Sequence, residues 1–208
     1  MNSVNVPDII VSRLPVYLRA LQYMAINGST TTSSQELGEK VGISAAQIRK
    51  DLSQFGEFGK QGTGYHIQFL TERLQQILKV DKVWDVVLVG MGELGHAILR
   101  YQGFSHRGFQ IVACFDSDPA KVGTQVGPYT IGNVSDIADV VKNAGIKMAM
   151  LCVPATAAQP VTDKLVEAGI KGILNYAPVS LTVPNNVRVQ YIDPVIGLQR
   201  MVYYMVGK

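Results

Sequence analysis

Three glycines have the spacing with which a protein backbone wraps a pyrophosphate group, in the segment Gly90-Met91-Gly92-Glu93-Leu94-Gly95. In such a segment the first glycine permits a tight turn, and the second lets the main chain approach the phosphates. The third lets the next helix pack close to the preceding strand, so that the positive N-terminal end of the helix faces the ligand. A match of this kind is weak on its own, and its meaning depends on the elements around it.

The elements on both sides of the glycine segment are typical of a dinucleotide-binding fold. An apolar strand is predicted over 84–89, directly before Gly90, and a second strand over 110–115 ends at Asp116. Asp116 follows Gly95 by about 20 residues, where such folds place the carboxylate that accepts from the ribose 2′-hydroxyl. Because the same carboxylate would repel a 2′-phosphate, the sequence predicts NADH or NAD⁺ as the ligand rather than NADP(H).

Strands and helices alternate from residue 84 onward. The predicted strands cover 84–89, 110–115, 148–153, 172–175 and 187–191, with a short one near 129–131, and the predicted helices cover 94–101, 135–144 and 156–168. This alternation predicts a Rossmann-like α/β domain, in which a parallel sheet is covered by helices on both faces.

Two loops follow central strands of that sheet, at the edge where open α/β sheets contact their ligands. One loop contains Val153, Pro154 and Ala155, and the other begins at Asn175. Both could equally be plain connections to the next element. Lys121 also has two interpretations, as a residue near the adenosine end of the ligand or as a solvated surface lysine, with the second slightly favoured.

Residues 8 to about 80 have a different, helical periodicity. Apolar residues recur every three or four positions from Ile10 to Met24, and Pro15 predicts that the regular helix starts close by with Ser12 as its cap. Two capping boxes follow, Ser33 with Glu36 and Ser44 with Gln47. They open two helices separated by a turn at 41–43, and the second helix runs from 45 to about 54. The pattern predicts a helix-turn-helix.

The second of these helices is the candidate for reading DNA, because its N-terminal residues face base edges in such motifs. A glycine-rich hairpin predicted over 58–67 forms a candidate wing beside the phosphate backbone or the minor groove. The candidate DNA-binding residues are Ser44, Gln47, Arg49, Lys50 and Ser53 on the helix, with Lys60 and Tyr65 on the wing. A small helical docking domain is the alternative interpretation.

Composition restricts the function less than the motifs do. The net charge is only +3, so charge alone does not indicate a nucleic-acid partner. Apolar runs are too short to span a bilayer, and the first residues lack signal-peptide features, so a cytoplasmic location is expected. Cys114 and Cys152 lie in predicted buried strands, which favours core positions over a disulfide or a metal site.

Catalysis is not expected from the titratable residues. None of the three histidines, His66, His96 and His106, has a sequence neighbour that would orient it as a base. An NAD(H)-dependent oxidoreductase with an N-terminal helical dimerisation domain nevertheless remains the first alternative. At the other end of the chain, the stretch 194–205 is apolar on nearly every side, which predicts a helix buried against another subunit.

Six sequence segments and one single residue together resemble the redox-sensing transcriptional repressor Rex family over nearly the whole chain. They are Arg-Leu-Pro-Val-Tyr-Leu-Arg at 13–19, Gln-Ile-Arg-Lys-Asp-Leu-Ser at 47–53, Gly-Thr-Gly-Tyr at 62–65, Val-Gly-Met-Gly-Glu-Leu-Gly at 89–95, Phe-Asp-Ser-Asp at 115–118, Ala-Gly-Ile-Lys-Gly-Ile-Leu-Asn at 168–175 and the terminal Asp193. The segment at 168–175 is also similar to coenzyme A-binding modules of acyl-CoA ligases, which gives a second alternative.

The Rex resemblance implies a homodimer that binds a palindromic operator in double-stranded DNA and leaves it when NADH rises relative to NAD⁺. It implies a winged helix over 1–80, an NAD(H)-binding domain over 81–192, and a helix over 193–208 that is exchanged between subunits. Tyr101 and Asp193 would lie near the nicotinamide, with Arg19 as a partner of that aspartate in one of two states. Pro194 stands where some family members carry an aromatic residue.

Overall fold

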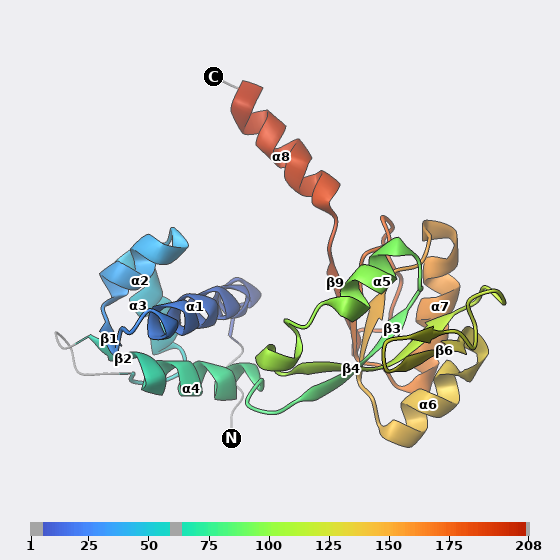
Figure 1. Cartoon of the computed structure of the whole chain (residues 1–208). Helices are drawn as coiled ribbons and strands as arrows, with labels where there is room; N and C mark the ends of the chain where they lie inside the picture. The colour runs from blue at the N-terminus through green and yellow to red at the C-terminus, as the bar shows by residue number, and fades with distance from the viewer. Residues whose placement is uncertain (1–5, 59–63, 207–208) are drawn as a thin grey trace. The chain divides into compact units, whose positions relative to one another are not determined.

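The computed structural model describes residues 6–58 and 64–206 of the chain. The chain divides into two compact units, Met1–Lys82 and Val83–Lys208 (Figure 1). Each unit has its own core of buried apolar residues. No helix within the described residues is long and apolar enough to cross a membrane.

Within its described residues, the first unit consists of four helices and a two-stranded sheet. In chain order the elements are α1 (Asp8–Ile26), β1 (Thr31–Thr32), α2 (Ser34–Val41), α3 (Ala45–Ser53), β2 (Tyr65–His66) and α4 (Ile67–Leu78). The apolar residues that recur along α1 form one buried stripe. This stripe packs mainly against α4 and also against α2, and the buried Ile48 and Leu52 attach α3 to the same core.

Helix α1 begins earlier than its proline predicts. It starts at Asp8 and contains Pro15 in its interior, while the Ser12 hydroxyl donates to the Ile9 carbonyl instead of capping the helix. Proline lacks the N–H that would donate to the carbonyl four residues earlier, and its ring crowds that carbonyl, so a helix continues through it only where other contacts offset the cost. Leu14 before the proline and Tyr17 after it are both fully buried, so packing of the apolar face extends the helix through the proline.

The two predicted capping boxes have different outcomes. At α2, the Glu36 N–H donates to Ser33 Oγ at 3.1 Å and the Ser33 N–H donates to Glu36 Oε2 at 2.9 Å, so the complete box is confirmed. At α3, the Gln47 N–H donates to Ser44 Oγ at 3.3 Å. The Gln47 side chain, however, donates to Asp51 rather than turning back to the cap.

The prediction of a hairpin over 58–67 is wrong for the residues of this range that the structure describes. Phe58 is buried in the core of the first unit, and Ile67 already belongs to α4. Strand β2 pairs antiparallel with β1, with Thr32 opposite Tyr65, so its partner comes from the connection between α1 and α2. Residues 59–63, including Lys60 of the candidate wing, lie outside the described residues.

The second unit is a seven-stranded sheet with helices on both faces. In chain order its elements are β3 (Trp84–Val89), α5 (Glu93–Arg100), η1 (Ser105–Arg107), β4 (Phe109–Asp116), β5 (Gln125–Val126), β6 (Tyr129–Asn133), η2 (Val134–Asp136), α6 (Ile137–Ala144), β7 (Met148–Leu151), α7 (Ala155–Ala168), β8 (Gly172–Asn175), β9 (Arg188–Tyr191) and α8 (Pro194–Val206). Each strand and helix predicted from residue 84 onward is present, with its ends shifted by at most a few residues.

The strand order of the sheet is β5-β6-β4-β3-β7-β8-β9, and only β5 runs antiparallel to its neighbour. Alternate residues of β3 face opposite sides of the sheet: Val87 and Val89 pack with residues of α6 and α7, whereas Val86 and Leu88 pack with Ile98 of α5. The strand order reverses between β3 and β7. Open α/β sheets bind ligands at the carboxyl ends of the strands at such a point.

Candidate functional site

The glycine segment lies at the carboxyl end of β3, at the reversal of strand order. Gly90 has a φ of +98°, and a Cβ atom on it would lie 2.5 Å from the Cys152 carbonyl oxygen. A Cβ on Gly95 would collide with the Gly90 carbonyl oxygen, whereas a Cβ on Gly92 would meet no atom within 4 Å. Packing of the protein thus requires the first and third glycines, while open space surrounds the second, where a phosphate would approach.

Asp116 ends β4 beside this segment and is tied to it directly. Its Oδ2 accepts from the Met91 N–H at 2.7 Å, and its Oδ1 accepts from the Asp118 N–H at 2.9 Å. Burial opposes ionisation of this carboxyl, which is 8% exposed, but the two backbone donors and the nearby Lys121 ammonium lower its pKa below the ordinary value. An ionised Asp116 therefore holds the glycine segment in place and can also accept from a ribose hydroxyl.

Lys121 forms ion pairs with this carboxylate and with the neighbouring Asp118. Its Nζ lies 3.3 Å from Asp116 Oδ2 and 3.9 Å from Asp118 Oδ2. With 38% of its side chain exposed, Lys121 is partly solvated and at the same time adjoins the candidate nucleotide site.

The remaining candidate cofactor residues surround the glycine segment on two sides. Met91 is fully buried, and Glu93 and Leu94 are exposed on the first turn of α5. Pro154 precedes Ala155, the first residue of α7, and the Val153 nitrogen would lie 2.9 Å from a Cβ on Gly90. The loop 153–155 and the glycine segment thus form one surface at the carboxyl ends of β3 and β7.

Asn175 has a supporting place in this surface. Its side chain is 1% exposed, and its Nδ2 donates to the carbonyls of Ala177 and Val179 at 3.1 and 3.0 Å. Its Oδ1 accepts from the Ala177 N–H at 2.9 Å. Because both amide hydrogens are used within its own loop, Asn175 shapes that loop and has no hydrogen left to donate to a ligand.

The three candidate switch residues come from both units. In the second unit, Tyr101 follows α5, is 52% exposed, and packs edge-to-face on Phe104 with 5.1 Å between ring centroids. Asp193 precedes α8, and its Oδ1 accepts from the Val195 N–H at 2.9 Å. Arg19 is an exposed residue of α1 in the first unit.

Helix α3 exposes a polar and basic surface. Arg49 and Lys50 are exposed, and Arg49 Nη1 donates to Ser34 Oγ at 3.0 Å. The Ser53 hydroxyl donates to the Lys50 carbonyl at 2.8 Å near the end of the helix. Tyr65 is partly buried in β2 and contacts the core of the first unit. Exposed cations and small residues on one short capped helix suit the phosphates and the major groove of DNA.

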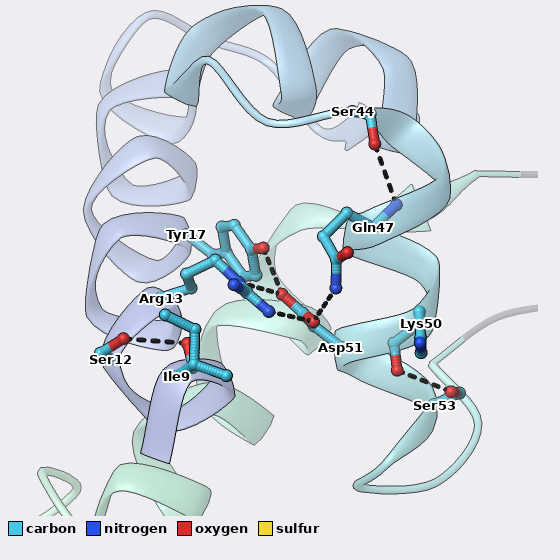
Figure 2. Close-up of polar contacts among 9 residues, drawn as sticks. All are labelled: Ile9, Ser12, Arg13, Tyr17, Ser44, Gln47, Lys50, Asp51 and Ser53. Atoms are coloured by element: carbon cyan, nitrogen blue, oxygen red, sulfur yellow. Dashed lines mark hydrogen bonds and ion pairs between the residues drawn. The ribbon is translucent and has the colours of Figure 1, made fainter. Parts of the chain in front are cut away.

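A buried network beneath α3 was not predicted from the sequence. Figure 2 shows Arg13 and Tyr17 of α1 and Gln47 of α3 converging on Asp51. The spacing contains a signal for it, because Arg13 and Tyr17 lie four residues apart on one helix, as do Gln47 and Asp51 on another. Asp51 also lies next to Leu52 and three residues after Ile48, on the buried side of α3.

The charges in this network are matched. Burial raises the pKa of Asp51, but hydrogen bonds from Arg13, Tyr17 and Gln47 outweigh it, so the net pKa is below the ordinary value. Burial and the bond to Asp51 raise the pKa of Tyr17, and the bond to Asp51 raises that of Arg13. The network therefore contains one anion, one cation and a neutral phenol.

Other reactive side chains do not form a second site within the described residues. No group of three or more His, Cys, Asp or Glu residues there could hold a metal ion. Cys114 and Cys152 are free thiols, and burial raises the pKa of Cys152 to about 12, which leaves it protonated and unreactive at neutral pH.

Comparison with protein families and relatives agrees with this two-part organisation. The family model described as CoA binding domain matches residues 81–179, and the one described as putative DNA-binding protein N-terminus matches residues 5–53. The redox-sensing transcriptional repressor Rex of Chloroflexus aggregans is 52% identical, over 96% of this chain and 94% of the relative. The Rex protein of Brevibacillus brevis is 44% identical, over 96% of this chain and 97% of the relative.

Solved structures are similar over the same length. The crystal structure of RSP in complex with beta-NAD⁺ and operator DNA has a TM-score of 0.91 and 36% identity, covering 98% of this chain and 94% of that chain. The crystal structure of RSP in complex with beta-NADH has a TM-score of 0.88 and 34% identity, covering 98% of this chain and 95% of that chain. RSP is a Rex-family repressor, so the expected winged helix followed by a Rossmann-like domain is confirmed as the fold class. The chain belongs to the redox-sensing transcriptional repressor Rex family.

Proposed function

We propose that this chain is a DNA-binding transcriptional repressor that senses the ratio of NADH to NAD⁺, binding its operator at low NADH and leaving it at high NADH. The observation that carries the proposal is that one chain combines a capped, basic α3 with a glycine segment tied to Asp116. Relatives with the same two parts are named repressors, and RSP has been crystallised both with beta-NAD⁺ and operator DNA and with beta-NADH.

The proposal assigns one role to each part of the chain. Residues 1–80 bind a palindromic operator in double-stranded DNA, with Ser44, Gln47, Arg49, Lys50 and Ser53 on α3 and with Lys60 and Tyr65 on the wing. Residues 81–192 bind NADH or NAD⁺ between the glycine segment, Asp116 and the loop 153–155. Because a repressor acts where its operator lies, a cytoplasmic location is part of the proposal.

A homodimer is also part of the proposal, with residues 193–208 as the dimerisation segment. Every described residue of α8 is exposed in the single chain, although most of them are large and apolar. In aqueous solution, such an apolar helix is normally covered by another protein surface. Exchange of α8 between two copies of the chain would cover this helix in both copies. A twofold dimer also matches a palindromic operator, because its two α3 helices meet two identical half-sites.

The switch must couple the nicotinamide to the state of the dimer. NADH and NAD⁺ differ by one hydride and by the charge of the ring, and a ligand shifts an equilibrium only by its differential affinity for the two states. Tyr101 and Asp193 are proposed to lie near the ring, with Arg19 as the partner of Asp193 in one state. The ring charge would then bias a nearby carboxylate and its partner.

A mobility-shift titration with a palindromic operator tests this function. Micromolar NADH is expected to release the DNA, while NAD⁺ at the same concentration leaves the complex intact. Equal behaviour of the two nucleotides would contradict the sensor proposal. Binding that weakens with rising salt is expected as well, because Lys and Arg contacts release counterions from the phosphates.

Two other functions can be separated from this one. The match to a CoA binding domain over residues 81–179 favours coenzyme A as a second candidate ligand. Competition between coenzyme A and NADH in a fluorescence binding assay distinguishes them, because a coenzyme A site would lose bound NADH. An NAD(H)-dependent oxidoreductase would instead oxidise NADH in the presence of a small carbonyl acceptor, whereas a sensor leaves NADH unchanged.

A further inference from the structure

Asp51 is a fully buried carboxylate whose two oxygens accept four hydrogen bonds (Figure 2). From α1, Arg13 Nε donates to Oδ2 at 2.6 Å, Arg13 Nη2 donates to Oδ1 at 2.7 Å, and the Tyr17 hydroxyl donates to Oδ2 at 2.6 Å. The fourth donor is the side-chain nitrogen of Gln47, 2.7 Å from Oδ1. The three bonds from Arg13 and Tyr17 therefore hold the carboxylate from α1. The fourth bond connects the carboxylate to Gln47, which lies on the candidate DNA-binding helix.

This arrangement determines which way the Gln47 amide points. A glutamine side chain has a carbonyl oxygen and an NH₂ group that can exchange places by rotation. An ionised carboxylate only accepts hydrogen bonds, so a rotated amide would bring two acceptor oxygens together next to a buried charge. Arg13 and Tyr17 are donors that keep Asp51 ionised. The amide nitrogen of Gln47 must therefore face Asp51, and its carbonyl oxygen must face away.

Gln47 is also at the right position to use that oxygen. It is the third residue of α3, after Ala45 and Ala46, and its side chain is partly exposed. In a helix-turn-helix the N-terminal residues of the second helix meet the base edges. The small side chains before Gln47 allow the helix to approach the groove closely.

We infer that Asp51 is a positioning residue that makes Gln47 present its carbonyl oxygen to the major groove, and that Gln47 thereby selects adenine at one position of each half-site. This inference rests on the proposed operator binding. In the major groove only adenine and cytosine offer an amino group as a donor, at N6 and N4, while guanine and thymine offer oxygen acceptors. Adenine is selected over cytosine because the second amide hydrogen of Gln47 can donate to its N7.

The experiment measures base preference with the full-length protein in the absence of NADH. Palindromic duplexes carrying each of the four bases at every half-site position compete for the protein in a mobility-shift assay. The wild-type protein is expected to prefer adenine at one position by about 5- to 150-fold, the range for one bidentate base contact. Gln47→Met removes the amide at similar volume and is expected to abolish that preference while leaving preferences at other positions unchanged.

Asp51→Asn is expected to abolish the same preference and no other. An asparagine can turn either its oxygen or its nitrogen toward Gln47, so both amide orientations become available. In the Gln47→Met background, Asp51→Asn should then have no further effect on base preference, because the residue acts through Gln47. Since Asp51→Asn alone leaves the Arg13 charge without its partner, Arg13→Gln/Asp51→Asn serves as a second, neutral version with the same expected outcome.

Gln68 and Glu72 provide the matched control. Gln68 Nε2 donates to Glu72 Oε1 at 3.0 Å, with the same spacing of four residues along α4 but on an exposed face. Gln68→Met and Glu72→Gln are expected to leave every base preference unchanged.

Several outcomes would overturn the inference. One is that Gln47→Met, or a folded Asp51 variant, keeps the preference for adenine. Another is that the Asp51 variants lose affinity equally for all DNA sequences. The uniform loss would mean that Asp51 only stabilises the domain. A wild-type protein that binds no palindromic duplex contradicts the proposed function instead.

Discussion

Arg13 and Asp51 form a two-bond ion pair that joins α1 to α3, with Nε–Oδ2 and Nη2–Oδ1 distances of 2.6 and 2.7 Å. The carboxylate is completely buried, whereas 21% of the Arg13 side chain stays exposed. A parallel pair of hydrogen bonds fixes direction as well as distance. The pair therefore sets the orientation of α3, the candidate recognition helix, on α1. The apolar contacts of Ile48 and Leu52 alone would leave that orientation less defined.

Arg13→Met should destabilise the first unit. The substitution keeps much of the apolar stem but leaves Asp51 as a buried charge with only neutral donors. Removing one partner of a buried pair costs about 3–5 kcal/mol of unfolding free energy, and the partial exposure of Arg13 places the expected value near 3 kcal/mol. Hydrogen exchange of the α1 and α3 amides measures it. Arg73→Met, on the exposed side of α4, is the control and should change exchange little.

The same carboxylate should make the first unit sensitive to acid. The pKa of Asp51 is lowered in the folded protein from its ordinary value of 3.8, so its contribution to stability is complete above that value. The contribution is lost as the pH falls from there through the folded pKa. Asp51→Asn has no group to titrate, so the difference in unfolding free energy between wild type and variant should shrink below about pH 4. A constant difference from neutral to acidic pH would contradict this expectation.

The nucleotide site was more predictable from the sequence than the DNA-binding helix. Glycine spacing and the distance to Asp116 are local chain properties, because β3, α5 and β4 follow one another directly. The network around Asp51 joins residues 38 positions apart, from Arg13 to Asp51, and helix periodicity alone does not indicate which polar residues meet. The predicted start of α1 was wrong for a related reason, since the burial of the apolar face on both sides of Pro15 depends on packing that the proline itself does not indicate.

The three glycines should respond differently to alanine. Gly90→Ala places a Cβ against the Cys152 carbonyl at a positive φ, and Gly95→Ala places one against Gly90, so both should destabilise the second unit. Gly92→Ala meets no protein atom within 4 Å and should leave the unfolding temperature nearly unchanged. It should nevertheless weaken NADH binding by at least 10-fold, because the methyl group occupies space where phosphates approach. Unchanged NADH affinity in Gly92→Ala would remove this segment from the site.

Asp116 and Lys121 should have opposite effects on the choice between NADH and NADPH. Asp116→Ala removes the acceptor of the Met91 N–H, so NADH affinity should fall by about 10- to 100-fold, the range for charge-assisted hydrogen bonds. It should also reduce discrimination against NADPH, because the remaining Lys121 attracts a 2′-phosphate. Lys121→Met leaves the carboxylate without its cation and should increase discrimination against NADPH. Fluorescence titrations with both nucleotides measure the ratio, and equal ratios in wild type and both variants would contradict these roles.

Helix α8 should control assembly of the dimer. Leu198 and Val202 lie four residues apart on one side of the helix and are both more than half exposed in the single chain. Burial of two such side chains contributes about 3–6 kcal/mol, so Leu198→Glu/Val202→Glu should weaken dimerisation by at least 100-fold. Sedimentation velocity over a concentration series measures the shift toward monomer. Gln199→Glu, which adds one charge at a position that is already polar, should keep the wild-type association.

Loss of the dimer should also change DNA binding in a specific way. A monomer meets only one half-site, so the double variant should lose its advantage for a full palindrome over a duplex that carries a single half-site. Its affinity for the single half-site should stay near that of the wild type, because α3 and its support from Asp51 are unaltered. A double variant that remains dimeric, or a monomer that still prefers the full palindrome, would show that α8 does not hold the two DNA-binding units together.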